Sequence, residues 1–109
     1  MRSIFMAAAV YAAFYVGLSA GAAGSNVVSV HMRQQSFAPD KVVVRSGSTI
    51  LWTNDDTIPH SVTADDGRFD SGPIPPGQSF KWEANANGNV TYHCIYHPSM
   101  TATLTVQQK

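Results

Sequence analysis

The 109-residue sequence contains a single cysteine, Cys94. One cysteine cannot form a disulfide within the chain, which excludes the disulfide-stabilised scaffolds that many small extracellular domains use. An unpaired thiol in an oxidising compartment is open to oxidation or mispairing unless it is buried or bound. Cys94 is therefore either an inert buried residue or a metal ligand, and its neighbours in the sequence decide between the two.

Charged residues are scarce and balanced, with seven Lys and Arg against seven Asp and Glu. The basic residues form no stripe of the kind that binds nucleic acid, and no run of like charge marks an interaction tail. No nucleic-acid partner is therefore expected, and a chain of this length predicts one domain. Asp55 and Asp56 are adjacent, but no ligand-spaced loop surrounds them, so we expect a solvated turn there rather than a calcium site.

Long apolar runs are confined to the N-terminus. Arg2 is followed by a stretch from Ile4 to Leu18 that is apolar apart from Tyr and Gly, and Ala20-Gly21-Ala22 matches a small-x-small cleavage signal. These features predict a signal peptide over residues 1–22 and a mature domain over residues 23–109, exported to the periplasm. The apolar stretch is shorter than the roughly 20 residues of a spanning helix, so membrane anchoring by an uncleaved leader is the less favoured alternative.

Beyond the leader, the sequence alternates between short apolar patterns and turn residues, without a helical period. Alternation with period two is typical of half-buried strands. Asn87-Gly88 is a strong hairpin signal because both residues tolerate positive φ. About seven to eight short strands with regular turns predict an all-β fold, an antiparallel β-sandwich. The clearest strands are expected at residues 26–32, 41–45, 49–54, 79–83, 89–94 and 101–106.

Potential metal ligands gather near the C-terminus, at Cys94, His97 and Met100. Thiolate and thioether are soft ligands and imidazole is borderline, and this combination favours copper. Blue-copper centres use two His and one Cys with a weak axial Met. The sequence therefore predicts one copper ion, with a second histidine supplied from elsewhere in the chain.

Strand alternation decides among the remaining histidines. His93 lies on the opposite face of its strand from Cys94, so it is a poor co-ligand. His31 lies on the more polar face of its strand and is expected at the surface. His60 remains, and Pro59 stiffens the chain before it by fixing its own φ. The predicted metal ligands are His60, Cys94, His97 and Met100.

This arrangement resembles the cupredoxins, and most closely the amicyanin and pseudoazurin–plastocyanin branch. The resemblance spans nearly all of residues 26–107, and the Cys-x2-His-x2-Met spacing with an upstream His is highly specific. It implies a Greek-key β-sandwich with a type 1 copper site at one end, which carries single electrons between redox partners by cycling Cu(II)/Cu(I). The residues that carry it are Phe37, Val42 to Val44, Trp52 to Asn54, Pro59-His60, Ser71-Gly72, Pro76-Gly77 and Tyr92 to Met100.

Two residues near the predicted ligands depart from the family pattern. Ser61 stands where the family usually has Asn. Its backbone N–H is expected to bond the sulfur of Cys94. Whether the serine side chain supports the site as the Asn side chain does in the family is left open. Tyr96 stands where amicyanin-like loops often have Pro, and its N–H is expected to donate a second bond to the same sulfur and raise the reduction potential. His97 is expected at the surface, inside an apolar ring where redox partners dock transiently. The expected ring residues are Pro59, Ile74, Tyr96 and Pro98.

The main alternative function is a periplasmic copper-binding or copper-delivery protein without a role in electron transfer. Such proteins usually favour several exposed Met or His residues, whereas residues 23–109 contain only Met32 and Met100. An enzyme is not expected, because the chain lacks the His-x-His pairs of multicopper oxidases, the second domain of copper nitrite reductases and the second cysteine of a binuclear centre. Zinc is disfavoured because a thioether is not one of its usual ligands. A monomer without a small-molecule substrate is expected.

Overall fold

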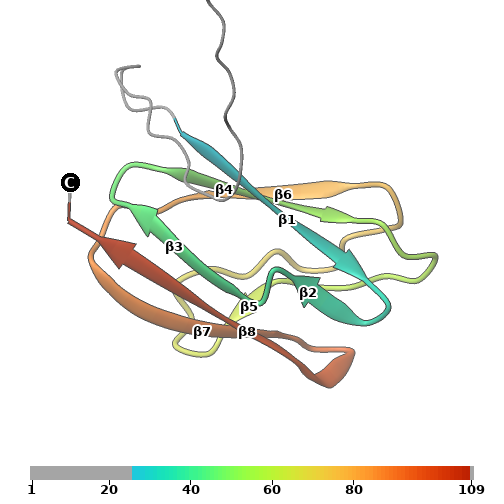
Figure 1. The fold of residues 1–109 in the computed structure, drawn as a ribbon. Coiled ribbons are helices and arrows are strands. Elements are labelled where there is room, and N and C mark those ends of the chain that lie inside the picture. Colours follow the sequence, from blue (N-terminus) through green and yellow to red (C-terminus); the bar gives the residue numbers. More distant parts are fainter. Residues whose placement is uncertain (1–25, 109) are drawn as a thin grey trace, which may run out of the picture.

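The computed structural model describes residues 26–108, which contain strands, turns and loops but no helix (Figure 1). Within this range, accordingly, no helix is available to span a bilayer. The predicted signal peptide, residues 1–22, lies outside the described residues. The strands are β1 (Val27–Arg33), β2 (Ser36–Ala38), β3 (Lys41–Arg45), β4 (Thr49–Asn54), β5 (Thr63–Ala64), β6 (Ser79–Glu83), β7 (Gly88–Cys94) and β8 (His97–Gln107).

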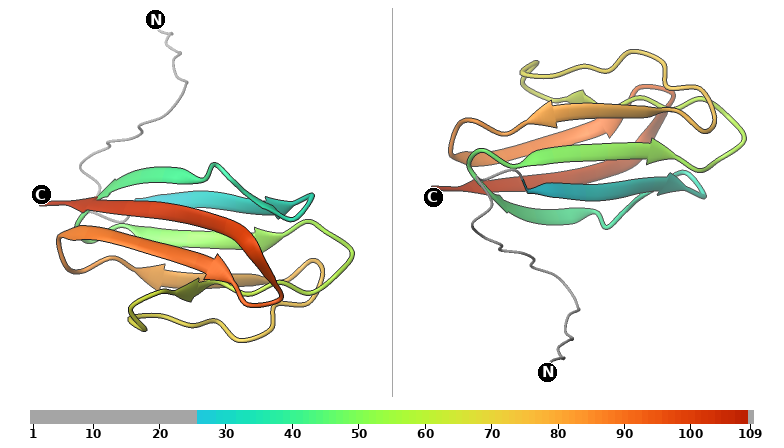
Figure 2. Two further views of the ribbon diagram at one scale, coloured as in Figure 1. Left: turned by 90° about the horizontal axis from the view of Figure 1, so that it is seen from below. Right: turned by 90° about the horizontal axis from the view of Figure 1, so that it is seen from above.

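The strands form two four-stranded sheets that pack face to face (Figures 1 and 2). One sheet has the order β2-β1-β4-β6 and the other β3-β8-β7-β5. The β-sandwich predicted from the sequence is thus confirmed. The sheets are mixed rather than purely antiparallel, however, because β1 runs parallel to β4 and β3 runs parallel to β8.

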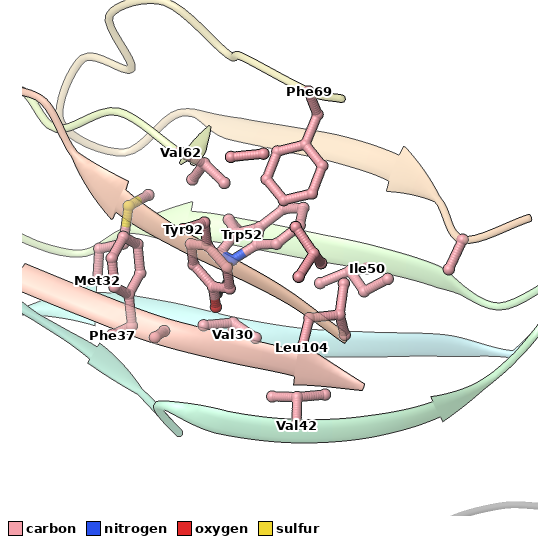
Figure 3. Packing of buried hydrophobic residues seen from close by; sticks show 14 of the residues in the cluster. Val30, Met32, Phe37, Val42, Ile50, Trp52, Val62, Phe69, Tyr92 and Leu104 are labelled. Carbon is pink, nitrogen blue, oxygen red and sulfur yellow. Dashed lines mark hydrogen bonds between the residues drawn. The ribbon is translucent and has the colours of Figure 1, made fainter. Parts of the chain in front are cut away.

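The core follows from the alternation of side chains along the strands. In β4, Ile50, Trp52 and Asn54 all face inward and are fully buried. Trp52 lies beside Tyr92 of β7 at the centre of the sandwich, and its Nε1–H donates to the Tyr92 hydroxyl at 3.2 Å (Figure 3). Burying one large apolar side chain stabilises a fold by about 1.5–3 kcal/mol. The shared core therefore gives the two sheets a fixed relative position.

The hairpin predicted at Asn87-Gly88 is wrong. Gly88 does have a positive φ of 122°, but β6 and β7 belong to different sheets. The segment that leaves β6 is bonded instead to the turn between β3 and β4. The N–H of Ala84 donates to the carbonyl of Ser48, and the N–H of Gly47 donates to the carbonyl of Ala84. These bonds carry the chain from one sheet to the other rather than back along β6.

Three connections meet at one end of the sandwich, on the right of Figure 1. They are the β1–β2 turn at Gln34–Gln35, the loop that follows β4, and the β7–β8 turn at Ile95–Tyr96. The last strand begins at His97, earlier than predicted, so only two residues separate it from Cys94. All of the predicted metal ligands lie on or beside these connections and the strands that they join.

Candidate metal centre

Cys94 is the last residue of β7 and is a free, fully buried cysteine. Alternation along β7 turns its side chain into the core together with Val90 and Tyr92. Its Sγ accepts a hydrogen bond from the backbone N–H of Ser61 at 3.3 Å, and the Nδ1 of His60 lies 3.7 Å from the same sulfur. The structure therefore brings the thiol and one imidazole together, as the sequence predicted for this pair.

His60 is fully buried although it lies in a loop. Its backbone pairs with Ile74: the His60 N–H donates to the Ile74 carbonyl at 3.2 Å, and the Ile74 N–H donates to the His60 carbonyl at 2.7 Å. The side-chain amide of Asn54 donates to the carbonyls of Ile58 and Ile74, both at 2.9 Å. These bonds hold the loop rigidly against the core, which explains how a loop residue can be as well positioned as a strand residue.

The second nitrogen of the His60 ring is occupied. Its Nε2 lies 2.7 Å from Oδ2 of Asp56, whose two oxygens also accept the N–H groups of Gln34 and Gln35. Partial burial raises the pKa of Asp56, but the bonds with His60 and with the two amides outweigh it and hold that pKa below the usual 3.8. The sequence interpretation of Asp56 as part of a solvated turn is therefore wrong. Four residues separate Asp56 from His60, but this spacing brings two side chains together only in a helix, so the sequence carried no local signal for the contact.

His97 is the first residue of β8 and pairs in register with Cys94. Its ring lies edge-on to that of His60, with 5.1 Å between the ring centroids. The side chain is half-buried rather than at the surface, and its Nε2 is the one buried side-chain nitrogen or oxygen of residues 26–108 without a hydrogen-bond partner. A buried polar atom without a partner is costly, and so this nitrogen is suited to a ligand that the chain itself does not supply.

Met100 follows three residues later on β8 and is 2% exposed, within the core. Residues 26–108 contain no ready-made group of three or more His, Cys, Asp or Glu side chains around one point. The geometry thus brings His60 next to Cys94 and His97 next to His60, while the full set of four ligands with Met100 stays a prediction. A buried thiol, a facing imidazole and an unpartnered imidazole nitrogen fit a soft or borderline metal such as copper.

The other two histidines lie outside this cluster, as predicted. The Nδ1 of His93 is bonded to Asp65 at 2.6 Å on the outer face of its sheet. The Nδ1 of His31 is bonded to Asp55 at 2.7 Å on the surface. Strand alternation therefore separated His60 correctly from its competitors as the neighbour of Cys94.

The two residues that depart from the family pattern have different outcomes. Ser61 keeps the backbone bond to the sulfur, and its Oγ also accepts the N–H of Ile95 at 3.0 Å and bonds Thr63 Oγ1 at 2.9 Å. A side-chain brace is therefore present. The second bond predicted from the N–H of Tyr96 to the sulfur is absent from residues 26–108. Tyr96 belongs to the outward-facing turn, whereas the sulfur points inward, toward Ser61.

Apolar side chains are exposed around the β7–β8 turn. Tyr96 is 44% exposed, and Pro59 and Pro98 are also at the surface, as expected. Ile74 is only 4% exposed, so its predicted place in the surface ring is wrong: its backbone pairing with His60 draws it into the core. The large exposed apolar side chains that the prediction omitted here are Ile58, at 37%, and Ile95, at 51%.

Comparison with known proteins agrees with this architecture. The family model described as a cupredoxin-like domain matches residues 6–106. Amicyanin-alpha of Methylorubrum extorquens is 30% identical over 125 residues, covering 98% of this chain and 100% of the relative. Plastocyanin of Scenedesmus fuscus is 29% identical over 84 residues, covering 65% of this chain and 86% of the relative.

Solved structures show the same fold. A copper(I) structure of an amicyanin variant superposes with a TM-score of 0.71 at 21% identity, covering 74% of this chain and 82% of that one. A purple cupredoxin from Nitrosopumilus maritimus superposes with a TM-score of 0.68 at 24% identity, covering 73% of this chain and 99% of that one.

Proposed function

The chain belongs to the cupredoxin-like family, with amicyanin among its relatives, and we propose that it is a small exported type 1 copper protein that carries single electrons between redox partners. The proposed ligands of one copper ion are His60, Cys94, His97 and Met100. The observation that carries the proposal is the buried Sγ of Cys94, which lies 3.7 Å from Nδ1 of His60 and accepts the backbone N–H of Ser61 at 3.3 Å.

Bound copper would supply a centre that gains and loses one electron, with no substrate bond made or broken. The residues of the chain would keep the reorganisation small. Cys94 is held by its strand and by the N–H of Ser61, and His60 is held by Ile74 through two backbone bonds. Ligands on a packed β-sandwich move little between oxidation states, and little movement favours fast electron transfer. The N–H bond to the sulfur also stabilises charge on the thiolate and thereby tunes the potential.

The decisive experiment is to load the purified protein with Cu(II) and record its visible spectrum and voltammogram. An intense thiolate-to-copper band that bleaches on reduction and returns on oxidation is expected. Cys94→Ser should abolish the band, whereas His93→Gln, which alters a histidine outside the cluster, should leave it intact. A native protein that shows no such band after loading would contradict the proposal.

Copper delivery without electron transfer is the alternative function. Its distinguishing property would be rapid loss of copper to a competing chelator together with poor reversibility at an electrode. The burial of Cys94 and His60 favours a retained ion, because neither side chain is accessible from solvent. Fast, complete release to a chelator, without a reversible redox wave, would favour delivery.

Export and docking complete the proposal. We infer that residues 1–22 are removed as a signal peptide, which leaves a periplasmic monomer that begins at Ala23. Expression in a bacterium, followed by mass spectrometry of the periplasmic fraction, tests this cleavage. We also infer that redox partners dock transiently at the exposed apolar side chains beside His97. Small interfaces are typical of weak redox encounters. The proposed docking patch consists of Ile58, Pro59, Ile95, Tyr96 and Pro98.

A further inference from the structure

Asp56 connects two parts of the chain that are distant in sequence. Its Oδ1 accepts the N–H of Gln34 at 2.7 Å, and its Oδ2 accepts the N–H of Gln35 at 3.1 Å and lies 2.7 Å from Nε2 of His60. The Asp56 side chain is 18% exposed and that of His60 is fully buried. The carboxylate is thus fixed by backbone on one side and contacts a candidate metal ligand on the other.

We propose that Asp56 is a positioning residue that holds His60 with its Nδ1 directed at Cys94, and that the β1–β2 turn supports Asp56 in this task. The inference rests on the proposed metal site, which it extends to a residue and a turn that the ligand motif does not include. Asp56 does not touch the proposed metal and acts only through the His60 ring.

The chemistry of the carboxylate determines which form of the imidazole it holds. An ionised carboxylate only accepts hydrogen bonds, so Nε2 of His60 must carry the proton that is shared with Asp56. In the neutral ring, the free lone pair is then on Nδ1, the nitrogen 3.7 Å from Sγ of Cys94. Metal-binding histidines commonly donate their other ring N–H to a carboxylate or a carbonyl, which fixes the ring and raises its basicity.

The turn depends on Asp56 in return. Gln34 and Gln35 have φ angles of +54° and +56°, and they connect the antiparallel strands β1 and β2. A two-residue turn with both φ angles positive normally favours Asn-Gly, because other side chains are unfavourable there. Both glutamine N–H groups point at the Asp56 carboxylate, which therefore compensates for a turn sequence that is poor on its own. The turn and His60 consequently share one anchor.

The first test compares Asp56→Asn with Asp55→Asn. The two variants remove the same charge from adjacent positions, but Asp55 bonds the exposed side chains of His31 and Arg33 and has no bond to His60. An asparagine at position 56 has a single acceptor oxygen and cannot satisfy both glutamine amides and the His60 ring.

We expect Asp56→Asn to bind copper about 10- to 100-fold more weakly than the native protein. We also expect a more positive reduction potential, because a less basic histidine stabilises Cu(II) less. Asp55→Asn should remain close to the native protein in both measurements. Equal changes in the two variants would indicate only a general effect of charge, and no change in Asp56→Asn would overturn the inference directly.

A second measurement does not need the metal. In the metal-free protein, ¹⁵N NMR of the His60 ring should show the tautomer with hydrogen on Nε2, and Asp56→Asn should shift the ring toward a mixture of tautomers. If the native protein fails to form a copper band but shows this tautomer change, the proposed function is wrong and the positioning role stands. If copper binds but the tautomer is unaffected by the variant, the positioning role is wrong.

A third variant separates positioning from stability. Gln34→Asn with Gln35→Gly supplies the turn with its preferred sequence. Added to Asp56→Asn, this pair should restore the melting temperature and leave the copper affinity and potential of the Asp56→Asn variant unchanged. Recovery of affinity and potential together with the melting temperature would show that Asp56 acts on the fold alone, and would overturn the inference.

Discussion

The backbone N–H of Ser61 donates to the Sγ of Cys94 across 3.3 Å, from the residue that directly follows His60 in the chain. The Oγ of the same serine accepts the N–H of Ile95, the residue after Cys94, at 3.0 Å. One residue of the loop between β4 and β5 is thus joined to two consecutive residues, the last of β7 and the one that follows it. The distance between the His60 ring and the Cys94 sulfur is set by these bonds and requires no metal to define it.

Ser61→Ala should destabilise the metal-free protein by about 1 kcal/mol, because it removes the acceptor of the Ile95 N–H while leaving the backbone bond to the sulfur in place. Urea unfolding monitored by tryptophan fluorescence measures this loss. Ser79→Ala is the matched control, since the Ser79 hydroxyl bonds Thr53 at 3.0 Å on the exposed part of β6. An equal loss of stability in Ser79→Ala would mean that the hydrogen bond between Ser61 and Ile95 contributes no more than an exposed one.

Copper should raise the thermal stability of the protein, and the gain should grow with the logarithm of the free copper concentration above its Kd. A ligand that binds only the folded state at a free concentration one hundred times its Kd stabilises by about 2.7 kcal/mol. Calorimetry of each variant against its own metal-free form should show this gain for the native protein and for His31→Ala, whose ring lies on the surface. Cys94→Ala should lose most of this gain in stability. An undiminished gain in that variant would show that copper binds at another site.

Tyr92 should impose an alkaline limit on stability. Burial, opposed in part by the bond from Trp52 and reinforced by the charge of Asp40, raises the pKa of the Tyr92 hydroxyl from 10.0 to about 12. The folded state therefore holds this proton more tightly than the unfolded state. The resulting stabilisation is complete below pH 10 and is lost as the pH rises toward 12.

Tyr92→Phe tests this relationship. The change from 10.0 to about 12 corresponds to on the order of 2–3 kcal/mol. The variant should be less stable at neutral pH, because the Nε1–H of Trp52 loses its acceptor, but its stability should decline less steeply above pH 10. Guanidinium unfolding between pH 8 and the alkaline limit compares the two slopes, and parallel slopes would contradict the assignment to Tyr92.

The proposed docking patch can be probed without knowing the partner. Electron self-exchange between oxidised and reduced copies of the copper-loaded protein requires two copies to meet near their metal sites. Ile95→Lys should slow this exchange at low ionic strength, since it places a charge in an apolar contact and makes both copies repel. NMR line broadening in mixtures of the two oxidation states gives the rate.

Val43→Lys is the control for this prediction. Val43 is 62% exposed, and it pairs with Thr105 near the far end of β8 from His97. The same charge introduced there should leave the exchange rate close to native. Slowing of equal size in the two variants would attribute the effect to net charge rather than to the patch.

Local alternation explains what could be predicted from the sequence. The two-residue period of a strand is visible directly in the sequence. It places Ile50, Trp52 and Asn54 on the inward face, and it gives His93 and Cys94 opposite orientations. The prediction of a β-sandwich and the separation of His60 from the other upstream histidine follow from the same rule.

The errors concern contacts between residues far apart in the chain. Asp56 is bonded to Gln34 and Gln35, which precede it by 22 and 21 residues, and no local pattern indicates that a surface-like Asp-Asp pair meets another turn. Ile74 was misplaced for a similar reason, since its pairing with His60 depends on how a proline-rich loop returns to the core. Sequence patterns therefore predicted the strands better than the connections between them.

The position of β8 determines when the second sheet can form. This strand lies in the interior of its sheet, between β3 and β7, and it follows both of them in the sequence. Within residues 26–108, β3 pairs with no strand other than β8, so Lys41 and its neighbours pair only with residues as distant as Thr103. Long-range pairing of this kind slows folding. The segment from Cys94 to Met100 runs from the end of β7 into β8, so the proposed metal site is expected to form together with this sheet rather than before it.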